Sequence, residues 1–461
     1  MTDEPIERAA TDADPDELDQ ARVDAILDAV EAGDAARVSE LMAPLHAADI
    51  ADFLEQIGHG ERQAFLALYA VEIDGEILSE IDESIREEVI EYLPSEVVAE
   101  AVRELESDDV VDILEDIEEP EKQRAILEAL TDADRIAVER ALSYPENSAG
   151  RLMQRETVIA PEHWSVGEAI DFLRNAEWLP EQFYHVILVD PRMRPVGYVT
   201  LGKLLSSARK TKLKAILEDS FRTVEVTDEE SDVAYVFNQY HLISAPVVDE
   251  SGRLVGVITI DDAMTVLDEE HEEDILRLAG VGEGSLTDRV VETTKQRLPW
   301  LFVNLLTAIL ASGVIAQFEN TIAQLVALAV LMPIVASMGG NAGTQSLTVA
   351  VRALATRDLT SSNLWRVIRR EALVGLVNGI FFALVMGLVG WFWFGLPMLG
   401  VVIATAMVVN LVVAGLSGIL IPVAMEKAGV DPALASGTFV TTVTDVVGFF
   451  VFLGLAGMLL L

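Results

Sequence analysis

Cysteine is absent from the 461-residue sequence. Its absence excludes disulfide bonds, thiolate metal sites and cysteine nucleophiles. The six histidines are scattered without the spacing of zinc ligands, so we expect no zinc site. Residues 1–20 are acidic and lack the apolar core of a signal peptide, so we expect that the N-terminal half is not secreted.

Positive charge is scarce: 32 lysines and arginines oppose 76 acids, which leaves a net charge of −44, and only seven of the bases are lysine. Six acids and six bases lie from Leu298 onward, so the whole negative charge belongs to residues 1–297. Such a polyanion repels nucleic acid and attracts cations. We expect no nucleic-acid partner, and we interpret the acids both as a halophile's solvated surface and as clusters that bind divalent cations.

A nucleotide-hydrolysis motif is also missing. Residues 197–203 (GYVTLGK) satisfy most of a phosphate-loop pattern, but Leu204 replaces the Ser or Thr that would hold Mg²⁺. The repeat described next also predicts a strand at 198–201, where a glycine-rich loop would be required. We therefore expect that the protein is not an enzyme.

The soluble half falls into two parts. Residues 16–143 have apolar residues at helical spacing, with helices expected at 23–32, 47–56, 85–92, 96–105 and 108–117, which predicts a stack of helical hairpins. Residues 189–200 then recur at 248–259, and each copy predicts strand, turn, strand and helix. This duplication resembles a pair of CBS domains, regulatory modules known for binding adenine nucleotides.

The nucleotide pattern of CBS domains is a Thr or Ser followed three positions later by Asp. Thr259 and Asp262 satisfy it, whereas Thr200 of the first copy is followed by Lys203. ATP is therefore a candidate regulatory ligand of the CBS pair.

Five apolar segments long enough to span a bilayer follow. The bases lie before the first segment and in the loops after the second and fourth, which predicts a multi-pass protein of the cytoplasmic membrane with its N-terminal half in the cytoplasm and its C-terminus outside. The expected fold class is therefore multidomain, with an all-α hairpin domain, an α+β CBS pair, a connecting helix and an all-α membrane domain. The expected divisions are an acidic disordered tail at 1–15, the helical domain at 16–143, CBS domains at 144–210 and 211–267, the connecting helix at 268–297 and the membrane domain at 298–461 with spans near 298–316, 322–350, 372–394, 399–424 and 434–461.

Asp445 is a lone carboxylate in the last apolar segment, roughly 16 Å from Leu434 at about 1.5 Å per residue and thus near the middle of a core about 30 Å thick. An intramembrane acid costs about 2.5 to 3.5 kcal/mol and usually serves an ion pathway. The alternative is that it binds the hydroxyls of Thr441, Thr442 or Thr444 and only stabilises packing.

The second apolar segment contains Pro333 and then a run of glycines and amides at 339–346 (GGNAGTQS). We interpret this run as an unwound stretch that lines a pore; close helix packing is the alternative. Gly375 and Gly379 on the third segment form a GxxxG pattern, which predicts packing alone.

Several motifs, distributed over nearly the whole chain, resemble those of the MgtE family of magnesium channels both in their sequences and in their order. They are YPENSAGRLM at 144–153, GGNAGTQS at 339–346, RALA at 352–355, VDPAL at 430–434 and TDVVG at 444–448. The resemblance implies a homodimer in the lipid bilayer, with an Mg²⁺ pore on the two-fold axis and Asp445 of both copies near its centre. Pore-lining candidates are Gly339, Gly340, Asn341, Gln345, Ser346, Ser436 and Gly437. At the position of Gly437, family members often carry Asn.

The resemblance also implies that the connecting helix is a plug, held closed when regulatory Mg²⁺ binds between acidic faces and released when cytosolic Mg²⁺ is low. Candidate regulatory ligands are Asp108, Asp109, Asp228, Glu230, Asp232, Asp262, Glu270, Glu273 and Asp274.

The expected function is thus Mg²⁺-gated, passive import of Mg²⁺. Two alternatives stay open at this point. One is a membrane-anchored nucleotide or Mg²⁺ sensor without transport. The other is the same channel passing Mn²⁺, Co²⁺ or Ca²⁺, because one ring of carboxylates does not fix the metal.

Overall fold

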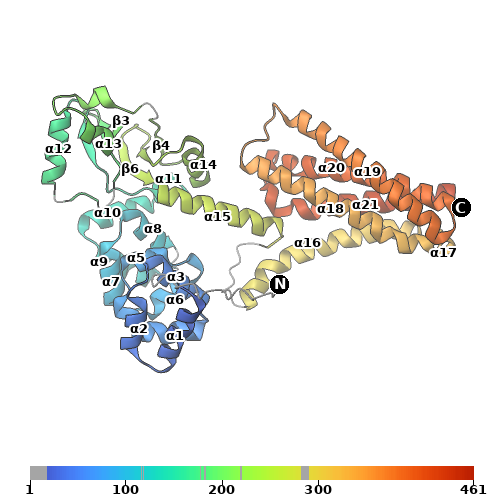
Figure 1. Cartoon of the computed structure of the whole chain (residues 1–461), viewed down its shortest axis with the longest axis horizontal. Coiled ribbons are helices and arrows are strands. Elements are labelled where there is room, and N and C mark those ends of the chain that lie inside the picture. Colours follow the sequence, from blue (N-terminus) through green and yellow to red (C-terminus); the bar gives the residue numbers. More distant parts are fainter. Residues whose placement is uncertain are drawn as a thin grey trace, which may run out of the picture. The chain divides into compact units, whose positions relative to one another are not determined.

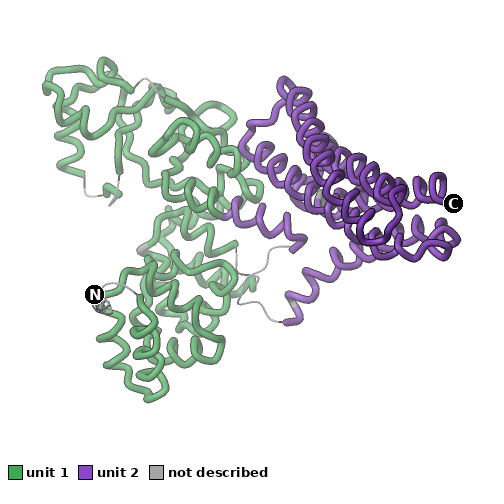
Figure 2. Tube along the Cα trace, turned by 45° about the vertical axis from the view of Figure 1, so that its right-hand side comes forward, with its two compact units in different colours: residues 1–268 green, residues 269–461 purple. Residues whose placement is uncertain are grey.

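The computed structural model describes residues 18–461 apart from 116, 118, 177, 181–182, 219–220 and 282–289, and apart from the side chains of Glu104, Glu292, Ala435 and Ser436. The expected tail at 1–15 therefore lies outside the described residues. The chain forms two compact units, residues 1–268 and 269–461 (Figure 2).

The first unit opens with short amphipathic helices, as predicted (Figure 1). Alternate helices pack on one another, α3 on α5, α5 on α7 and α7 on α9, with α2, α4 and α6 forming a second row. Asp19, Asp34 and Asp74 cap helices by accepting main-chain N–H bonds, so some of the acids serve local structure. The elements are α1 Gln20–Glu31, α2 Ala35–Met42, α3 Ala47–Gln56, α4 His59–Tyr69, η1 Ala70–Glu72, α5 Gly75–Glu80, α6 Glu83–Tyr92, α7 Ser95–Glu104, α8 Ser107–Glu115, α9 Pro120–Ala129 and α10 Asp132–Ala141.

Two three-stranded sheets follow, and they confirm the internal repeat. In each sheet a short first strand pairs parallel with the second, which pairs antiparallel with the third. His185 pairs with Thr200 and Ser244 with Thr259, and the same bulge interrupts both ladders. The elements are α11 Ala149–Leu152, β1 Ile159–Pro161, α12 Val166–Asn175, β2 His185–Val189, β3 Pro195–Thr200, α13 Leu201–Ser206, η2 Leu213–Ile216, β4 Val224–Glu225, α14 Glu230–Tyr240, β5 Ser244–Val248 and β6 Leu254–Thr259.

The helix that follows the second CBS copy, α15 (Ile260–Leu278), runs through the expected boundary at 268. Thr259 precedes it, and Gly280 ends the segment at φ +71°, a conformation that favours glycine. The next described helix begins only at Val290, and 282–289 lie outside the described residues, so the expected single helix over 268–297 is wrong at both ends.

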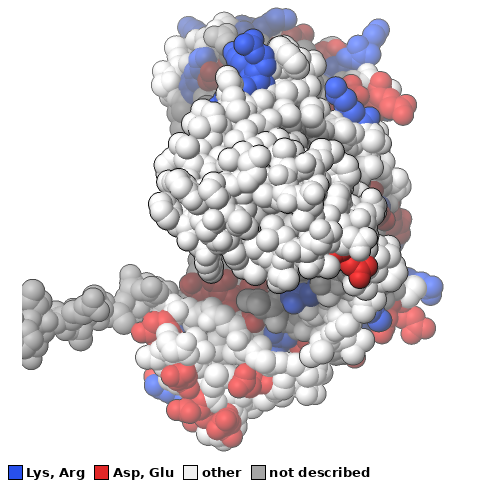
Figure 3. All heavy atoms as spheres, turned by 90° about the vertical axis from the view of Figure 1, so that its right-hand side faces the viewer, with Lys and Arg blue, Asp and Glu red and all other residues white. Residues whose placement is uncertain are grey.

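Five helices in the second unit are long and apolar enough to cross a membrane, and the spans are Thr293–Gln317, Ala327–Ala355, Leu364–Phe394, Pro397–Lys427 and Gly437–Leu459. The end of this bundle near α17 and the C-terminus carries almost no charged side chains (Figure 3). The elements are α16 Val290–Gln317, α17 Glu319–Gln324, α18 Ala327–Ala355, α19 Leu364–Phe394, α20 Pro397–Lys427 and α21 Pro432–Leu459. The second span starts later than expected because residues 319–324 form the separate helix α17.

The run at 339–346 is continuous α-helix, so the expected unwinding is wrong. Its glycines bring helices close instead: a Cβ on Gly339 would lie 2.2 Å from Asn410 Nδ2, and one on Gly343 would lie 2.5 Å from a Val440 methyl. The predicted packing role of Gly375 is confirmed, since a Cβ there would lie 2.6 Å from the Leu411 carbonyl oxygen.

Candidate functional site

Asp445 lies within α21 and is half-buried. Its carboxylate makes no hydrogen bond or ion pair with any residue in the described part of the chain. The nearby hydroxyls are already used: Thr441 donates to the Gly437 carbonyl at 3.0 Å, Thr442 to that of Thr438 at 2.6 Å and Thr444 to that of Thr441 at 2.9 Å. A hydroxyl has one proton, so none of the three donates to Asp445, and the packing alternative is not supported.

The helix α18 has one polar face that the other described helices of the chain leave open. Its exposed residues recur at helical spacing and are Ser337, Asn341, Thr344, Gln345 and Thr348. The opposite face is buried and includes Val335, Gly339, Gly343, Ser346 and Leu347. The glycine and amide run therefore divides between packing and an open polar surface.

This polar face adjoins the helix that carries Asp445. A Cβ on Gly340 of α18, which is partly exposed, would lie 3.9 Å from the Thr441 methyl of α21. Thr441 precedes Asp445 by one helical turn. The open side of α18 and the turn that leads to Asp445 therefore form one continuous surface.

Of the predicted pore-lining residues, Gly340, Asn341 and Gln345 lie on the partly or fully exposed side of α18. Gly339 and Ser346 are buried, and Ser346 Oγ donates to Glu371 Oε2 of α19 at 2.9 Å. The Ser436 side chain lies outside the described residues. Ser337 and Thr348 on the same face were not predicted, although a search for polar residues at three and four spacing would have found them. Thr344 lies within the predicted run at 339–346, and Thr441 was predicted only as a possible hydrogen-bond partner of Asp445.

The end of α15 contacts the start of α21 within the second unit. Leu278 packs with a cluster of Leu347, Val351, Ala433 and Val440, and its carbonyl oxygen lies 3.8 Å from the position of a Cβ on the predicted residue Gly437. The end of α15 therefore covers one end of α21.

An ion pair strengthens this contact. Arg277 Nη1 lies 2.9 Å from Asp431 Oδ2, and Arg277 also pairs with the predicted residue Glu273. Asp431 in turn caps α21 by accepting the Ala433 N–H at 2.8 Å. Asp431 was missed because its sequence position, before Pro432, reads as an ordinary helix start.

Like charges gather at the same place. Burial raises the pKa of Asp274, and the carboxylates of Asp431 and Glu270 raise it further, while His271 opposes them. The predicted regulatory residue Asp274 therefore lies near Asp431, and the predicted residue Glu270 lies one helical turn before Asp274, which makes this a candidate cation site within the second unit.

A second group of acids lies within the first unit, where α8 meets the start of α15. Burial raises the pKa of Asp108, and Asp262 and Asp109 add to the effect. Burial also raises the pKa of Glu106 to about 7, that of Asp109 to about 7 and that of Asp262 to about 6. We call Glu106, Asp108, Asp109 and Asp262 the acidic cluster.

The acidic cluster brings the adjacent predicted residues Asp108 and Asp109 together with Asp262, more than 150 residues away, and with Glu106, which was missed. Gln154 Nε2 donates to Glu106 Oε2 at 2.5 Å, and Glu156, which accepts from Ser107 Oγ at 2.9 Å, adds another nearby charge. Among the described residues, no three carboxylate or imidazole groups are arranged as direct ligands of one metal ion. A cation here would keep part of its water, as Mg²⁺ commonly does.

The other predicted regulatory acids have local roles. Asp228 accepts the Glu225 N–H at 2.8 Å in a turn, and Glu230 and Asp232 lie in the first turn of α14, where acids suit the helix dipole. Their regulatory role stays a prediction.

The candidate nucleotide pair is joined by a hydrogen bond, Thr259 Oγ1 to Asp262 Oδ2 at 2.6 Å, and Asp262 also accepts the Thr259 N–H at 3.3 Å. This arrangement starts α15 in the manner of a capping box. The same pair therefore has a structural role whether or not it binds a nucleotide.

Family models match the chain in three places: a divalent cation transporter model at residues 332–455, the MgtE intracellular N domain at 45–147, and CBS domains at 149–210 and 213–269. Together with the five spans, these matches define the class: a multi-pass membrane protein of the divalent cation transporter type with a helical domain and a CBS pair.

Curated magnesium transporters MgtE are similar over most of the chain. The protein from Thermus thermophilus is 33% identical over 439 residues, which cover 94% of this chain and 97% of the relative. That from Enterococcus faecalis is 36% identical over 322 residues, or 70% and 71% of the two chains. A crystal structure described as the cytosolic domain of the Mg²⁺ channel MgtE in complex with ATP is 29% identical, with a TM-score of 0.49, and covers 53% of this chain and 99% of that one. The chain belongs to the MgtE family.

Proposed function

We propose that this protein is a homodimeric Mg²⁺ channel that imports Mg²⁺ passively across the cytoplasmic membrane, with Asp445 as its pore carboxylate. One observation carries the proposal: Asp445 lies in a membrane-spanning helix, has no described partner and adjoins an open polar surface. A charge kept in the membrane at such a cost needs a counter-charge, and a passing cation supplies it.

The neighbouring hydroxyls suit a hydrated ion. Thr344 and Thr441 each donate their proton to a helix carbonyl, at 2.9 and 3.0 Å, and so present only acceptor lone pairs to the open surface. Water bound to Mg²⁺ presents protons outward, and Mg²⁺ gives up its water reluctantly. These side chains can therefore hold the hydrated ion while the Asp445 carboxylate supplies charge.

The open polar face of α18 supports the homodimer. Unsatisfied polar groups such as Asn341 and Gln345 are costly against lipid, so the face requires water or another polar surface. A second copy related by a two-fold axis would place the same face opposite and enclose a polar path between the two Asp445 side chains.

The gate that we propose is electrostatic. In the second unit, the carboxylates of Glu270 and Asp431 both repel that of Asp274, and a divalent cation beside Asp274 would hold the end of α15 against α21 near Gly437. In the first unit, the acidic cluster would hold α8 against α15 in the same way. High cytosolic Mg²⁺ would thus keep the channel closed, and low Mg²⁺ would release it.

ATP is proposed as a second regulatory ligand of the CBS pair. Ribose hydroxyls would donate to Asp262, as the Thr259 hydroxyl does now. Binding of a fluorescent ATP analogue to wild type and Thr259→Val would test this, and equal binding by both would contradict it.

Flux into liposomes tests the channel. Mg²⁺ entry into vesicles that contain the full chain should be abolished by Asp445→Ala, and competition by Mn²⁺, Co²⁺ and Ca²⁺ should rank selectivity. Undiminished flux in the variant would remove Asp445 from the path, and the absence of flux in wild type at low and high Mg²⁺ would favour a sensor.

A further inference from the structure

Three arginines in the first turns of α19, Arg366, Arg369 and Arg370, are exposed. None of their side chains forms an ion pair or hydrogen bond with a residue in the described ranges. The acids nearest in sequence are engaged elsewhere, since Glu371 accepts from Ser346 and Asp358 accepts from Thr356. In a chain with more than twice as many acids as bases, three unpaired guanidinium groups together are unusual.

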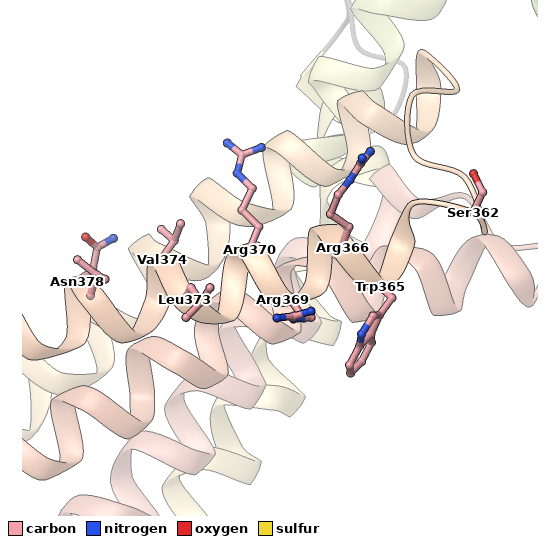
Figure 4. A pocket seen from close by; sticks show the side chains of 9 residues that line it. Ser362, Trp365, Arg366, Arg369, Arg370, Leu373, Val374 and Asn378 are labelled. Atoms are coloured by element: carbon pink, nitrogen blue, oxygen red, sulfur yellow. The ribbon is translucent and has the colours of Figure 1, made fainter.

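The arginines line a hollow of about 770 Å³ on the outer side of α19. Arg366 and Arg370 extend to the same side of the helix as Asn378, and Arg369 lies on the adjoining side (Figure 4). Positions three and four apart on a helix are neighbours, so their guanidinium groups can reach one anion. The other lining residues are Ser362, Trp365, Leu373, Val374 and Val377.

The hollow continues from charged to apolar along the helix. Leu373 is 58% exposed and Val377 is 65% exposed, and both lie within the third candidate span, where an exposed apolar side chain is available to lipid. Trp365, 69% exposed, stands at the start of the span, where the membrane interface favours tryptophan. A ligand with a phosphate at one end and a hydrocarbon chain at the other would match this surface.

We propose that this hollow binds the headgroup of an anionic phospholipid. Arg366, Arg369 and Arg370 would hold the phosphate through paired N–H bonds, and the acyl chain would lie along Leu373 and Val377. The amide of Asn378, further along the span, can donate a hydrogen bond to an ester carbonyl of a phospholipid. Inorganic phosphate has no such carbonyl. The apolar continuation therefore favours a lipid over inorganic phosphate.

Native mass spectrometry of the full-length protein in detergent tests the site. Phosphatidylglycerol should bind wild type at least about tenfold more tightly than phosphatidylcholine with the same acyl chains. The triple variant Arg366→Gln, Arg369→Gln, Arg370→Gln should lose this preference. The matched control Lys295→Gln, Arg297→Gln, Lys427→Gln removes the same charge from exposed bases outside the hollow and should keep it.

Three outcomes would overturn the proposal. The preference could persist in the triple variant, the control could lose it equally, which would indicate bulk charge, or millimolar inorganic phosphate could displace the lipid, which would indicate a simple anion site. If the triple variant fails to fold, Arg370→Gln and Arg370→Lys replace it: the Gln variant should bind phosphatidylglycerol more weakly than the Lys variant, and equal binding would contradict the proposal.

Discussion

The protein uses carboxylates in two opposite ways. In the first unit, Glu106, Asp108, Asp109 and Asp262 crowd together, and burial raises the pKa of each, with repulsion from neighbouring carboxylates adding to the effect. In the membrane-spanning part, Asp445 stands alone among described residues, with its neighbouring hydroxyls turned to the backbone. Several neighbouring carboxylates favour tight binding of a divalent cation. A single carboxylate favours weaker binding, from which the cation can be released.

The difference matches two requirements on binding. A regulatory site must hold Mg²⁺ at cytosolic concentrations, which favours several charges on surfaces that separate when the cation is lost. A conduction site must bind weakly enough to release the ion at a useful rate. We therefore expect charge removal to affect flux at Asp445 and stability at the acidic cluster.

The largest expected effect belongs to the lone carboxylate. Asp445→Asn keeps the shape and removes the charge, and we expect Mg²⁺ flux in liposomes to fall at least about a hundredfold, about 2.7 kcal/mol at 1.36 kcal/mol per decade. The matched control is Glu371→Gln, which removes another carboxylate of the membrane domain, one that is already bonded to Ser346. Equal losses in both variants would show that Asp445 has no special place on the path.

The second prediction concerns the effect of Mg²⁺ on stability through the acidic cluster. In wild type, saturating Mg²⁺ should stabilise the protein, by about 2.7 kcal/mol at a hundredfold excess over Kd. Asp108→Asn with Asp262→Asn should remove most of this gain, measured as the Mg²⁺-dependent shift in Tm of the full-length protein.

A control for that experiment removes two exposed acids of the helical domain, Glu128→Gln with Glu139→Gln, outside the acidic cluster. This variant should keep the Mg²⁺-dependent shift. If it loses the shift as well, the effect comes from the acidic surface in general and the cluster has no specific role.

Much of this architecture could be predicted because it depends on local pattern. The helix at 47–56 has the expected bounds, and the strand pairs of the duplicated domain keep the expected alignment of Thr200 with Thr259. Asp445 could be identified from the sequence because a charged residue within an apolar segment is recognisable without any knowledge of its tertiary contacts.

The features that could not be predicted from the sequence depend on contacts between residues that are distant in sequence. Sequence alone does not say that Gly339 faces Asn410 while Gly340 faces the open side, and the unwound backbone that it predicts at 339–346 is therefore wrong. It also does not bring Glu106 beside Asp262, because more than 150 residues separate them and only the fold joins α8 to α15. Glycine at membrane depth serves packing as readily as a pore, and its helix face decides between the two.

The two adjacent glycines sharpen this point. Gly339→Ala should cost about 1 to 3 kcal/mol, because its Cβ would lie 2.2 Å from Asn410 Nδ2, which is itself buried and donates to the Val335 carbonyl at 2.8 Å. Gly340→Ala meets only the Thr441 methyl at 3.9 Å and should leave Tm nearly unchanged. Adding Asn410→Ala should recover part of the loss at Gly339, and similar Tm values for the two single variants would contradict the assigned faces.

The smallest effect concerns pH. The raised pKa values of Glu106 and Asp109, about 7 in the folded protein, lie above the ordinary glutamate and aspartate values of about 4. Between these values the folded protein binds more protons than the unfolded chain, so without Mg²⁺ its stability should rise as pH falls from about 8 to about 5. In the proposed gate, protons would relieve the same repulsion as Mg²⁺, so the two would compete.

The measurement is the Mg²⁺ concentration that gives half-protection of the α15 segment from protease, at about pH 8 and about pH 6. We expect the midpoint to rise several-fold at the lower pH in wild type, because protons must leave before the cation binds. Glu106→Gln should flatten this dependence, while the exposed control Glu128→Gln should keep it. A midpoint that does not move with pH in wild type would mean that the acidic cluster is ionised throughout, and the contrast with Asp445 would then depend on the number of charges alone.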